Sequence, residues 1–376
     1  MIADELEALE LPEETEGYRL EERGGESVLV EKRRDMLDPK ARVFIGRMSE
    51  KIPADVGDAI VKVGARKIIS EGTLVAIKIN LGGGVNNVPT SYTDLLVAEG
   101  LIDKVRELGG RPFVCEANMR SMTMNRRMLT RRGLYPLLLR KGAEFVNLSE
   151  TADIDFHPLG WETPIRLARP LLHPDVKVIS VPALKHHWEC AISLAQKNMY
   201  GAIAERQKSI FHRSGTIDET VAAAARAVTP DISLLAHRQV GGQLGPHFCI
   251  PIDFGYIIAS DNVLAADYVG CDFLGTNWRD VKHLQINCNG QEIPFKPVKG
   301  SVEIDVETKQ RIAKTAISPR RLKFWRSFLF PQYWVPHKTQ YQQTYKIEPL
   351  ATWLNWLFFH SRGDPWQTQW RPPFNG

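Results

Sequence analysis

A chain of 376 residues is long enough to form one large or two moderate globular domains, each burying a substantial core. Its 43% hydrophobic and 24% charged residues exclude a fibrous or natively unfolded protein. The formal net charge of only +4 indicates no obligatory nucleic-acid or membrane partner.

The sequence shows no sign of export or membrane insertion. Residues 1–12 are acidic and lack the basic and apolar regions of a signal peptide. No uninterrupted apolar run approaches the ~18 residues that a membrane-spanning helix requires. We therefore expect a soluble, cytoplasmic protein with no transmembrane segment.

The five cysteines are scattered, odd in number and never arranged as Cys-x-x-Cys: Cys115, Cys190, Cys249, Cys271 and Cys288. Such spacing predicts neither a disulfide framework nor an iron–sulfur cluster. A metal ion in this protein would therefore rely mainly on histidines and carboxylates.

Three regions follow one another along the chain. Residues 1–45 are charged and interrupted by Pro and Gly, so we expect a loosely attached N-terminal arm with no catalytic role. Residues 46–300 are predicted to form an α/β core domain, and residues 301–376 a Trp-rich C-terminal extension.

The core begins with a strand–helix–strand pattern. Residues 73–80 form an apolar run typical of a buried strand, and residues 93–108 have the spacing of an amphipathic helix that ends at a Gly-Gly pair. Residues 111–116 predict the next strand. A right-handed βαβ unit is the expected connection between the two strands.

The alternation of helices and strands continues further along the chain. It predicts a basic helix over residues 124–141, strands over 144–148 and 176–182, a helix over 188–199 closed by Gly201, a strand over 254–259 and a helix capped by Asp261 that runs to about residue 274. The pattern favours an α/β fold with a mostly parallel sheet, helices on both faces, and an aromatic-rich C-terminal extension.

Two segments of the chain suggest binding surfaces. Between residues 119 and 142 there are seven basic residues and no acidic one, which predicts either an anion-docking surface or a solvated helix face. The last 56 residues hold six of the nine tryptophans, next to the basic residues Arg320, Arg321, Lys323 and Arg326. This extension is expected either to pack on the core or to bind a protein partner or a membrane surface.

Polar side chains gather where the predicted strands end. Lys78 and Asn80 end the first strand, and Glu116 and Asn118 end the second, each pair with the two-residue spacing that places both side chains on one face. Lys185 closely follows the third strand. Because ligands of open α/β sheets bind beyond the carboxyl ends of the strands, we expect these residues to form one site.

The site residues are assigned by the chemistry of their side chains. A histidine can act as a general base, and a lysine can hold an anionic oxygen or form a covalent adduct with a carbonyl. The candidate catalytic residues are Lys78, Glu116, Lys185, His186 and Lys197. The candidate substrate-binding residues are Asn80, Asn118, Asn198, Gly83 and His247, the last in a turn-rich loop over residues 241–249 that also carries Cys249.

The segment at residues 186–190 also offers metal ligands. His186, His187, Glu189 and Cys190 are ligand types suited to a divalent transition metal. The alternative is that these histidines are hydrogen-bonded within the fold and have only a structural role. Asp267 lies in a predicted apolar helix, where its carboxylate needs a partner such as Lys197.

Several short motifs resemble those of the domain-of-unknown-function family 362. They are Lys78-Ile-Asn80-Leu, Lys185-His-His187, Lys197-Asn198-Met-Tyr-Gly201 and Asp261 followed six positions later by Asp267, within a resemblance that covers residues 72–284. Some members of that family carry a ferredoxin-like iron–sulfur module, which this chain lacks. A fainter similarity links His186 or His187 and Lys197 to the N-terminal domain of nickel-pincer lactate racemases.

These observations give two hypotheses. The first is an enzyme that acts on a small anionic or carbonyl-containing molecule by redox or isomerase chemistry, with or without a metal. The second is a non-catalytic binding or assembly protein that uses the basic helix and the aromatic extension. Both are compatible with a homo-oligomer, and neither needs nucleic acid.

Overall fold

The computed structural model describes residues 1–82, 89–119, 123–204, 208, 211, 216–246 and 248–316. Three of our predictions lie outside the described residues. They concern Gly83, His247 and the tryptophans of the C-terminal extension. These tryptophans all follow residue 316.

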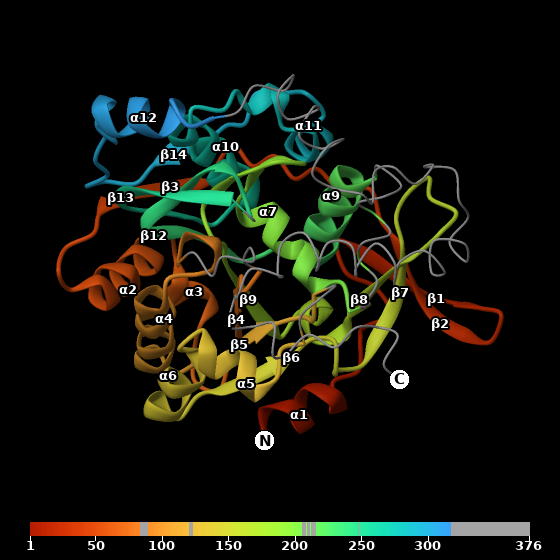
Figure 1. Cartoon of the computed structure of the whole chain (residues 1–376). Coiled ribbons are helices and arrows are strands. Elements are labelled where there is room, and N and C mark those ends of the chain that lie inside the picture. Colours follow the sequence, from red (N-terminus) through yellow and green to blue (C-terminus); the bar gives the residue numbers. More distant parts are fainter. Residues whose placement is uncertain are drawn as a thin grey trace, which may run out of the picture.

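A ten-stranded sheet forms the centre of the molecule (Figure 1). Its main order is β14 (Lys296–Pro297), β3 (Arg42–Arg47), β13 (Phe248–Ser260), β12 (Ile232–Leu244), β9 (Val176–Val181), β4 (Leu74–Ile79), β5 (Arg111–Glu116) and β6 (Glu144–Asn147). The five strands from β12 to β6 are parallel, while β13 is antiparallel to both of its neighbours. The predicted α/β fold with a largely parallel sheet is therefore confirmed.

The middle of the sheet is buried on both faces. All six residues of β4 are buried, as expected for a strand whose sequence is a continuous apolar run. Ile77 packs with α2 (Ile52–Lys62) and α4 (Leu95–Glu107), whereas its neighbour Ala76 packs on the other side with α9 (Ile217–Val228). Helices therefore cover both faces of the sheet.

The remaining helices complete these two layers. The first face is also covered by α3 (Ala65–Ile68), α5 (Arg126–Arg131) and α6 (Leu134–Lys141). The second face carries α7 (Ala195–Asn198), α10 (Val263–Leu274), α11 (Lys282–Cys288) and α12 (Val306–Ala313). Short 3-10 turns occur at Pro89–Ser91, Arg169–Leu172, Met199–Ala202 and Trp278–Asp280.

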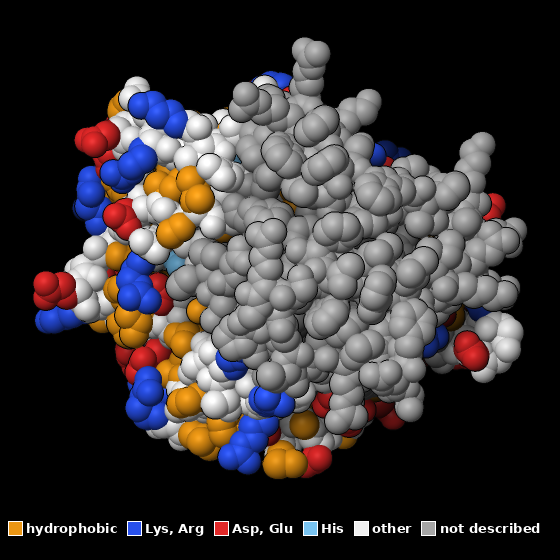
Figure 2. All heavy atoms as spheres, viewed as in Figure 1, with side chains coloured by type: hydrophobic (Ala, Val, Ile, Leu, Met, Phe, Trp, Pro, Cys, Tyr) orange, Lys and Arg blue, Asp and Glu red, His pale blue; other side chains and the backbone are white. Residues whose placement is uncertain are grey.

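None of the helices in the described part of the chain is long and apolar enough to cross a membrane. On the described surface visible in Figure 2, basic and acidic side chains are interspersed with apolar ones. This mixed surface matches the small net charge of the sequence.

The N-terminal segment differs from the loosely attached arm that its composition suggests. Helix α1 (Ile2–Ala8) buries Ile2 and Leu6, and β1 (Tyr18–Arg23) and β2 (Glu26–Glu31) form a second, four-stranded sheet with β7 (Asp153–His157) and β8 (Ile165–Ala168). Leu29 is fully buried, and the Tyr18 hydroxyl donates to the Leu172 carbonyl oxygen over 3.0 Å. The charged residues that suggested an arm alternate with the few apolar ones that face the core.

The predicted helix over residues 188–199 is wrong. The chain instead forms a hairpin of β10 (Lys185–His187) and β11 (Ala191–Ser193), followed by the single-turn helix α7. Ala191 has a positive φ of 64°, which a continuous helix would not permit. His186 and Lys197, both predicted catalytic residues, consequently lie on different elements, β10 and α7.

Three other predicted boundaries also differ. The basic helix over residues 124–141 is two helices, α5 and α6, because Gly133 between them has a φ of +76°. Asn262, and not Asp261, caps α10 by accepting from the Leu264 and Ala265 amides. Residues 241–249, predicted as a loop, are mostly the paired ends of the long strands β12 and β13.

Candidate functional site

Of the polar residues predicted at the ends of β4 and β5, Lys78 and Glu116 are in direct contact. The Lys78 ammonium donates to Glu116 Oε1 over 2.8 Å, to the Ile79 carbonyl oxygen over 2.7 Å and to Asn198 Oδ1 over 3.4 Å. Lys78, Glu116 and Asn198 are 0%, 2% and 3% exposed. The three side chains form a buried cluster at the carboxyl edge of the sheet.

Glu116 and Asn198 of this cluster make further hydrogen bonds to the backbone. Glu116 also accepts from the amides of Leu81, over 3.2 Å, and Ala117, over 2.9 Å. The Asn198 amide donates to the Lys78 carbonyl oxygen over 2.7 Å, which ties α7 to β4. A buried ion pair with this many partners holds its geometry firmly, so it positions the surrounding chain and is poorly suited to react.

Gly201 allows another segment to approach this ion pair. A Cβ atom at Gly201 would lie 2.4 Å from both the Lys78 Nζ and the Glu116 Oε1 atoms. Only a residue without a side chain fits there. Gly201 was predicted to end a helix, and it closes the Lys197-Asn198-Met-Tyr-Gly201 motif.

Lys185 lies in a different environment at the same edge of the sheet. Its ammonium nitrogen is 2.7 Å from the Ser91 carbonyl oxygen and 3.2 Å from both Asn80 Oδ1 and the Gly82 carbonyl oxygen. All three acceptors are neutral, and the side chain is 2% exposed. Burial lowers the pKa of Lys185 to about 7, so a substantial fraction of the amine is uncharged at neutral pH.

Cys249 lies beside Lys185. A Cβ at Gly245 would lie 2.9 Å from the Cys249 sulfur and 3.4 Å from Lys185 Cδ, so the two side chains border the same small space. Burial raises the pKa of the Cys249 thiol, which keeps it protonated at neutral pH. The segment over residues 241–249 was predicted to bring Cys249 to this edge, whereas Ser91 was not among the predicted site residues, because it belongs to no strand end that the sequence pattern reveals.

The predicted metal ligands do not fit a metal ion. His186 Nε2 is 2.8 Å from the Leu274 carbonyl oxygen, and burial lowers the pKa of His186. His187 Nδ1 accepts from the amides of Glu189 and Cys190, over 3.1 and 3.2 Å, so that nitrogen closes the hairpin turn. Within the described residues, no group of three or more His, Cys, Asp or Glu side chains is arranged to hold a metal.

Two other predicted site residues, Asn118 and Lys197, make their described contacts with other groups, although the Lys197 charge adds to the effect of burial in lowering the pKa of Lys185. Asn118 Oδ1 accepts from the Met124 amide over 2.7 Å and from Asn147 Nδ2 over 3.1 Å, beyond the ends of β5 and β6. The Lys197 ammonium lies 5.4 Å from the centre of the Tyr200 ring. These contacts anchor the chain around the site but do not bring either side chain to the Lys185 amine.

Asp267 has a role that differs from the predicted pairing with Lys197. It is fully buried in α10 and accepts from the backbone amides of Ala195, over 2.7 Å, and Gln196, over 3.0 Å. These are the first residues of α7, so Asp267 fixes the start of the short helix that carries Asn198 to Lys78. Its carboxylate acts as a cap supplied by another helix.

The basic segment is largely paired with neighbouring residues. Lys141 forms ion pairs with Glu99, over 2.8 Å, and Asp103, over 2.7 Å. Arg132 is 4% exposed and lies 4.5 Å from the centre of the Tyr92 ring. These contacts give the segment a structural role in joining α5 and α6 to α4.

The fold and the buried cluster define an α/β protein with polar residues gathered at the carboxyl edge of a largely parallel sheet. Residues 75–272, more than half of the chain, match the family described as Domain of unknown function (DUF362), and the chain belongs to this family. The match covers β4, β5, β9 and α10, and thus Lys78, Glu116, Lys185 and Asp267.

A curated relative is similar over much of the same region. It is the thylakoid-associated protein sll1697 of Synechocystis sp., which is 27% identical over 219 residues. The alignment covers 56% of this chain and 66% of that protein. The name of that protein describes an association with thylakoids and specifies no reaction.

Proposed function

We propose that this protein is an enzyme that acts on a small carbonyl-containing or anionic molecule, with the Lys185 amine as its reactive group. The observation that supports this proposal most directly is the set of neutral oxygens around Lys185. In the described structure its hydrogen bonds go to a side-chain amide and two backbone carbonyls, and to no carboxylate.

The contrast with Lys78 supports the choice of Lys185. Lys78 is similarly buried, but its amine nitrogen is ion-paired with the Glu116 carboxylate over 2.8 Å. Lys185 has no hydrogen bond to a carboxylate in the described structure, and burial, as the largest influence, lowers its pKa although the more distant Glu116 charge raises it. Only a neutral amine has the free electron pair that a nucleophile or a base requires.

The proposed chemistry is imine formation. The Lys185 nitrogen adds to the carbonyl carbon of the substrate, and the carbonyl oxygen then leaves as water. The resulting imine draws electrons from the adjacent carbon, which suits isomerase chemistry. Redox chemistry at the same carbon is a second class within this proposal, and it would need a separate two-electron oxidant or reductant as co-substrate.

Reductive trapping tests the proposal. The full chain is incubated with glyoxylate and cyanoborohydride between pH 6 and 9, and peptide mass mapping measures the adduct at each lysine. We expect Lys185 to be modified with a pH midpoint near 7. Lys40 is exposed and serves as the internal reference, against which the pH profile of the Lys185 adduct is compared.

Two variants make this result specific. Lys185→Met should remove the adduct while leaving the modification of Lys40 unchanged, and circular dichroism should verify its fold. Lys78→Met provides the matched buried control and should not remove the low-pH adduct at Lys185 in protein that remains folded. Absence of any adduct at Lys185, or a pH midpoint equal to that of Lys40, would refute the proposal.

A second candidate function is association with a membrane surface through the C-terminal extension. Two observations favour it. The six tryptophans of this extension follow the basic residues Arg320 and Arg321 in the sequence. The relative from Synechocystis is named for its association with thylakoids. Tryptophan and arginine side chains favour the interface of a bilayer.

Sedimentation with vesicles of anionic lipid tests this second function. The full chain should sediment with the vesicles, and a chain ending at residue 316 should remain in solution. Equal sedimentation of both chains would contradict it, and capture of a protein by the extension without vesicle binding would favour a protein partner. For the enzyme itself we propose a cytoplasmic location, where its five buried cysteines, none of which forms a disulfide in the described structure, remain reduced.

A further inference from the structure

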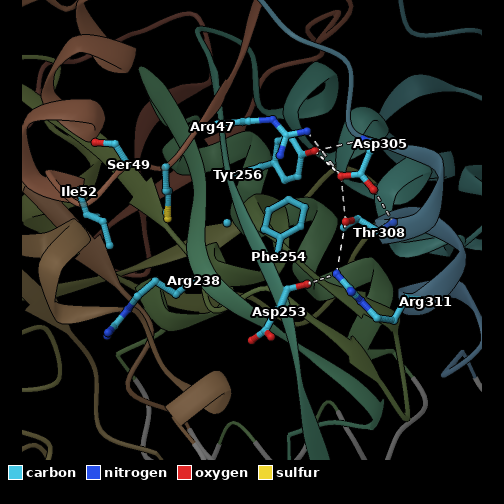
Figure 3. Close-up of a pocket in the computed structure, with 12 residues that line it drawn as sticks. Arg47, Ser49, Ile52, Arg238, Asp253, Phe254, Tyr256, Asp305, Thr308 and Arg311 are labelled. Atoms are coloured by element: carbon cyan, nitrogen blue, oxygen red, sulfur yellow. Dashed lines mark hydrogen bonds and ion pairs between the residues drawn. The ribbon is translucent and has the colours of Figure 1, made fainter.

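A second site is suggested by a pocket beside β3, β12 and β13 of the same sheet (Figure 3). The pocket has a volume of about 430 Å³ and lies between the end of β3, the strands β12 and β13, and α12. We propose that it binds a small organic anion carrying a phosphate or carboxylate group. The volume is in the range that small-molecule sites occupy, roughly 300–1,000 Å³.

Arg311 is the residue on which this proposal chiefly depends. Its guanidinium group donates to the Asp253 backbone oxygen over 3.1 Å and to the Thr308 hydroxyl oxygen over 3.3 Å. Both acceptors are neutral, and the described residues provide no carboxylate partner for Arg311. Its charge is therefore available to a ligand, and a guanidinium group suits the planar, two-point recognition of carboxylate and phosphate.

Two further arginines line the pocket. Arg47 lies over the Tyr256 ring, 4.8 Å from its centre, and its nearest carboxylate, Asp305, is 3.7 Å away. Asp305 already accepts from the Tyr256 hydroxyl over 2.6 Å and from the Thr308 amide over 2.7 Å. Arg238 pairs with Asp94 through Nε and Nη2, which leaves its Nη1 to face other groups.

Two carboxylates line the same pocket and limit where an anion can lie. The hydrogen bond from Tyr256 is the main cause that lowers the pKa of Asp305 to about 2, so this group is ionised at neutral pH. Asp253 accepts from the Gln239 side-chain amide over 2.8 Å. In Figure 3, Asp253 lies between Arg238 and Arg311, so its negative charge opposes an anion held by these two arginines.

This arrangement predicts opposite effects for two neighbouring substitutions. Isothermal titration calorimetry would measure the dissociation constants of inorganic phosphate and of succinate at constant ionic strength. Arg311→Gln should raise the dissociation constant of the preferred anion about tenfold, because a charge-assisted hydrogen bond is lost. Asp253→Asn should lower it roughly threefold, because an opposing charge near the surface is removed.

Two controls separate this site from other causes. Arg279→Gln removes an exposed arginine paired with Glu292 on another part of the surface and should leave anion binding unchanged. Lys185→Met should also leave it unchanged, and loss of binding in that variant would assign the anion to the Lys185 site. Equal dissociation constants in the wild type and Arg311→Gln, or no binding of either anion to the folded wild type, would overturn the proposal.

Discussion

Lys78 and Glu116 illustrate how strongly a buried ion pair depends on both partners. Their side chains are 0% and 2% exposed, and the ammonium and carboxylate lie 2.8 Å apart. Each charge is tolerated inside the protein only because the other is present. The proximity of Lys78 and Glu116 was predictable from the sequence, since strand ends of a parallel sheet share an edge. The sequence does not reveal that Lys78 is ion-paired whereas Lys185, in the described structure, hydrogen-bonds only to neutral oxygens.

Glu116→Gln should therefore be strongly destabilising. The substitution leaves the Lys78 charge buried without a carboxylate, which costs about 3–5 kcal/mol in the free energy of unfolding. Urea denaturation monitored by circular dichroism would measure this loss. Glu107→Gln, which breaks the exposed pair with Lys104, is the matched control and should leave the stability unchanged within error.

Gly201→Ala should disturb the same pair by steric overlap. A methyl group there would lie 2.4 Å from the charged atoms of Lys78 and Glu116, so the chain must move. We expect a loss of about 1–3 kcal/mol in the free energy of unfolding. Gly17→Ala, whose added Cβ would meet its nearest atom at 3.5 Å, serves as the control, and similar stabilities of the two variants would argue against this packing.

At the scale of elements, long apolar patterns were predictable and short polar ones were not. Strands β4, β5, β6 and β9 and helix α4 lie close to their predicted bounds, because each combines an apolar period with a clear end. The hairpin of β10 and β11 was missed because its polar residues happen to recur at helical spacing. The hydrogen bonds that His187 accepts from two backbone amides favour the hairpin instead, and no sequence pattern reveals them.

Helix α7 depends on a carboxylate from a different element. Its four residues cannot form a stable isolated helix, and Asp267 of α10 accepts from its first two amides. The sequence identified Asp267 as a buried carboxylate that needs partners, but the partners are backbone groups. Side-chain inventories cannot find such partners.

Asp267→Asn should abolish a pH dependence of stability. Burial raises the pKa of Asp267 from 3.8 to about 6, so the folded protein binds this proton more tightly than the unfolded chain. The resulting stabilisation is present below about pH 4 and is lost as the pH rises through about 6, on the order of 3 kcal/mol in total. The stability of the wild type relative to Asp267→Asn, measured by urea denaturation from pH 4 to 7.5, should fall by this amount. A constant difference would contradict the assignment.

At the scale of the whole molecule, the N-terminal segment is an integral part of the packing. Its strands complete the four-stranded sheet, and Arg226 of α9 forms an ion pair with the buried Glu31 of β2. Composition alone suggested otherwise, because the few buried apolar residues of this segment are spread among many charged ones. Burial by distant parts of the chain decides the outcome, and no local pattern contains that information.

Leu29→Ala tests this integration directly. Leu29 is fully buried in the core cluster that also contains Phe156 and Val221, so removing its side chain should cost about 2–5 kcal/mol. Urea denaturation should show a single transition with a lower midpoint. Glu26→Ala, on the exposed start of the same strand, should leave the midpoint unchanged, and equal midpoints for both variants would mean that the segment is only loosely attached.

The pairing of β3 has a consequence for the order in which the chain can mature. Arg42 on β3 receives its partner Asp261 from a position 219 residues further along the chain, and β13, its neighbour in the sheet, comes equally late. During synthesis, the inner strands β4, β5, β6 and β9 leave the ribosome while β3 still has an open edge. A nascent chain therefore exposes an unpaired strand until almost the entire core has been synthesised. During this interval the open edge of β3 can pair with strands of other chains and so promote aggregation.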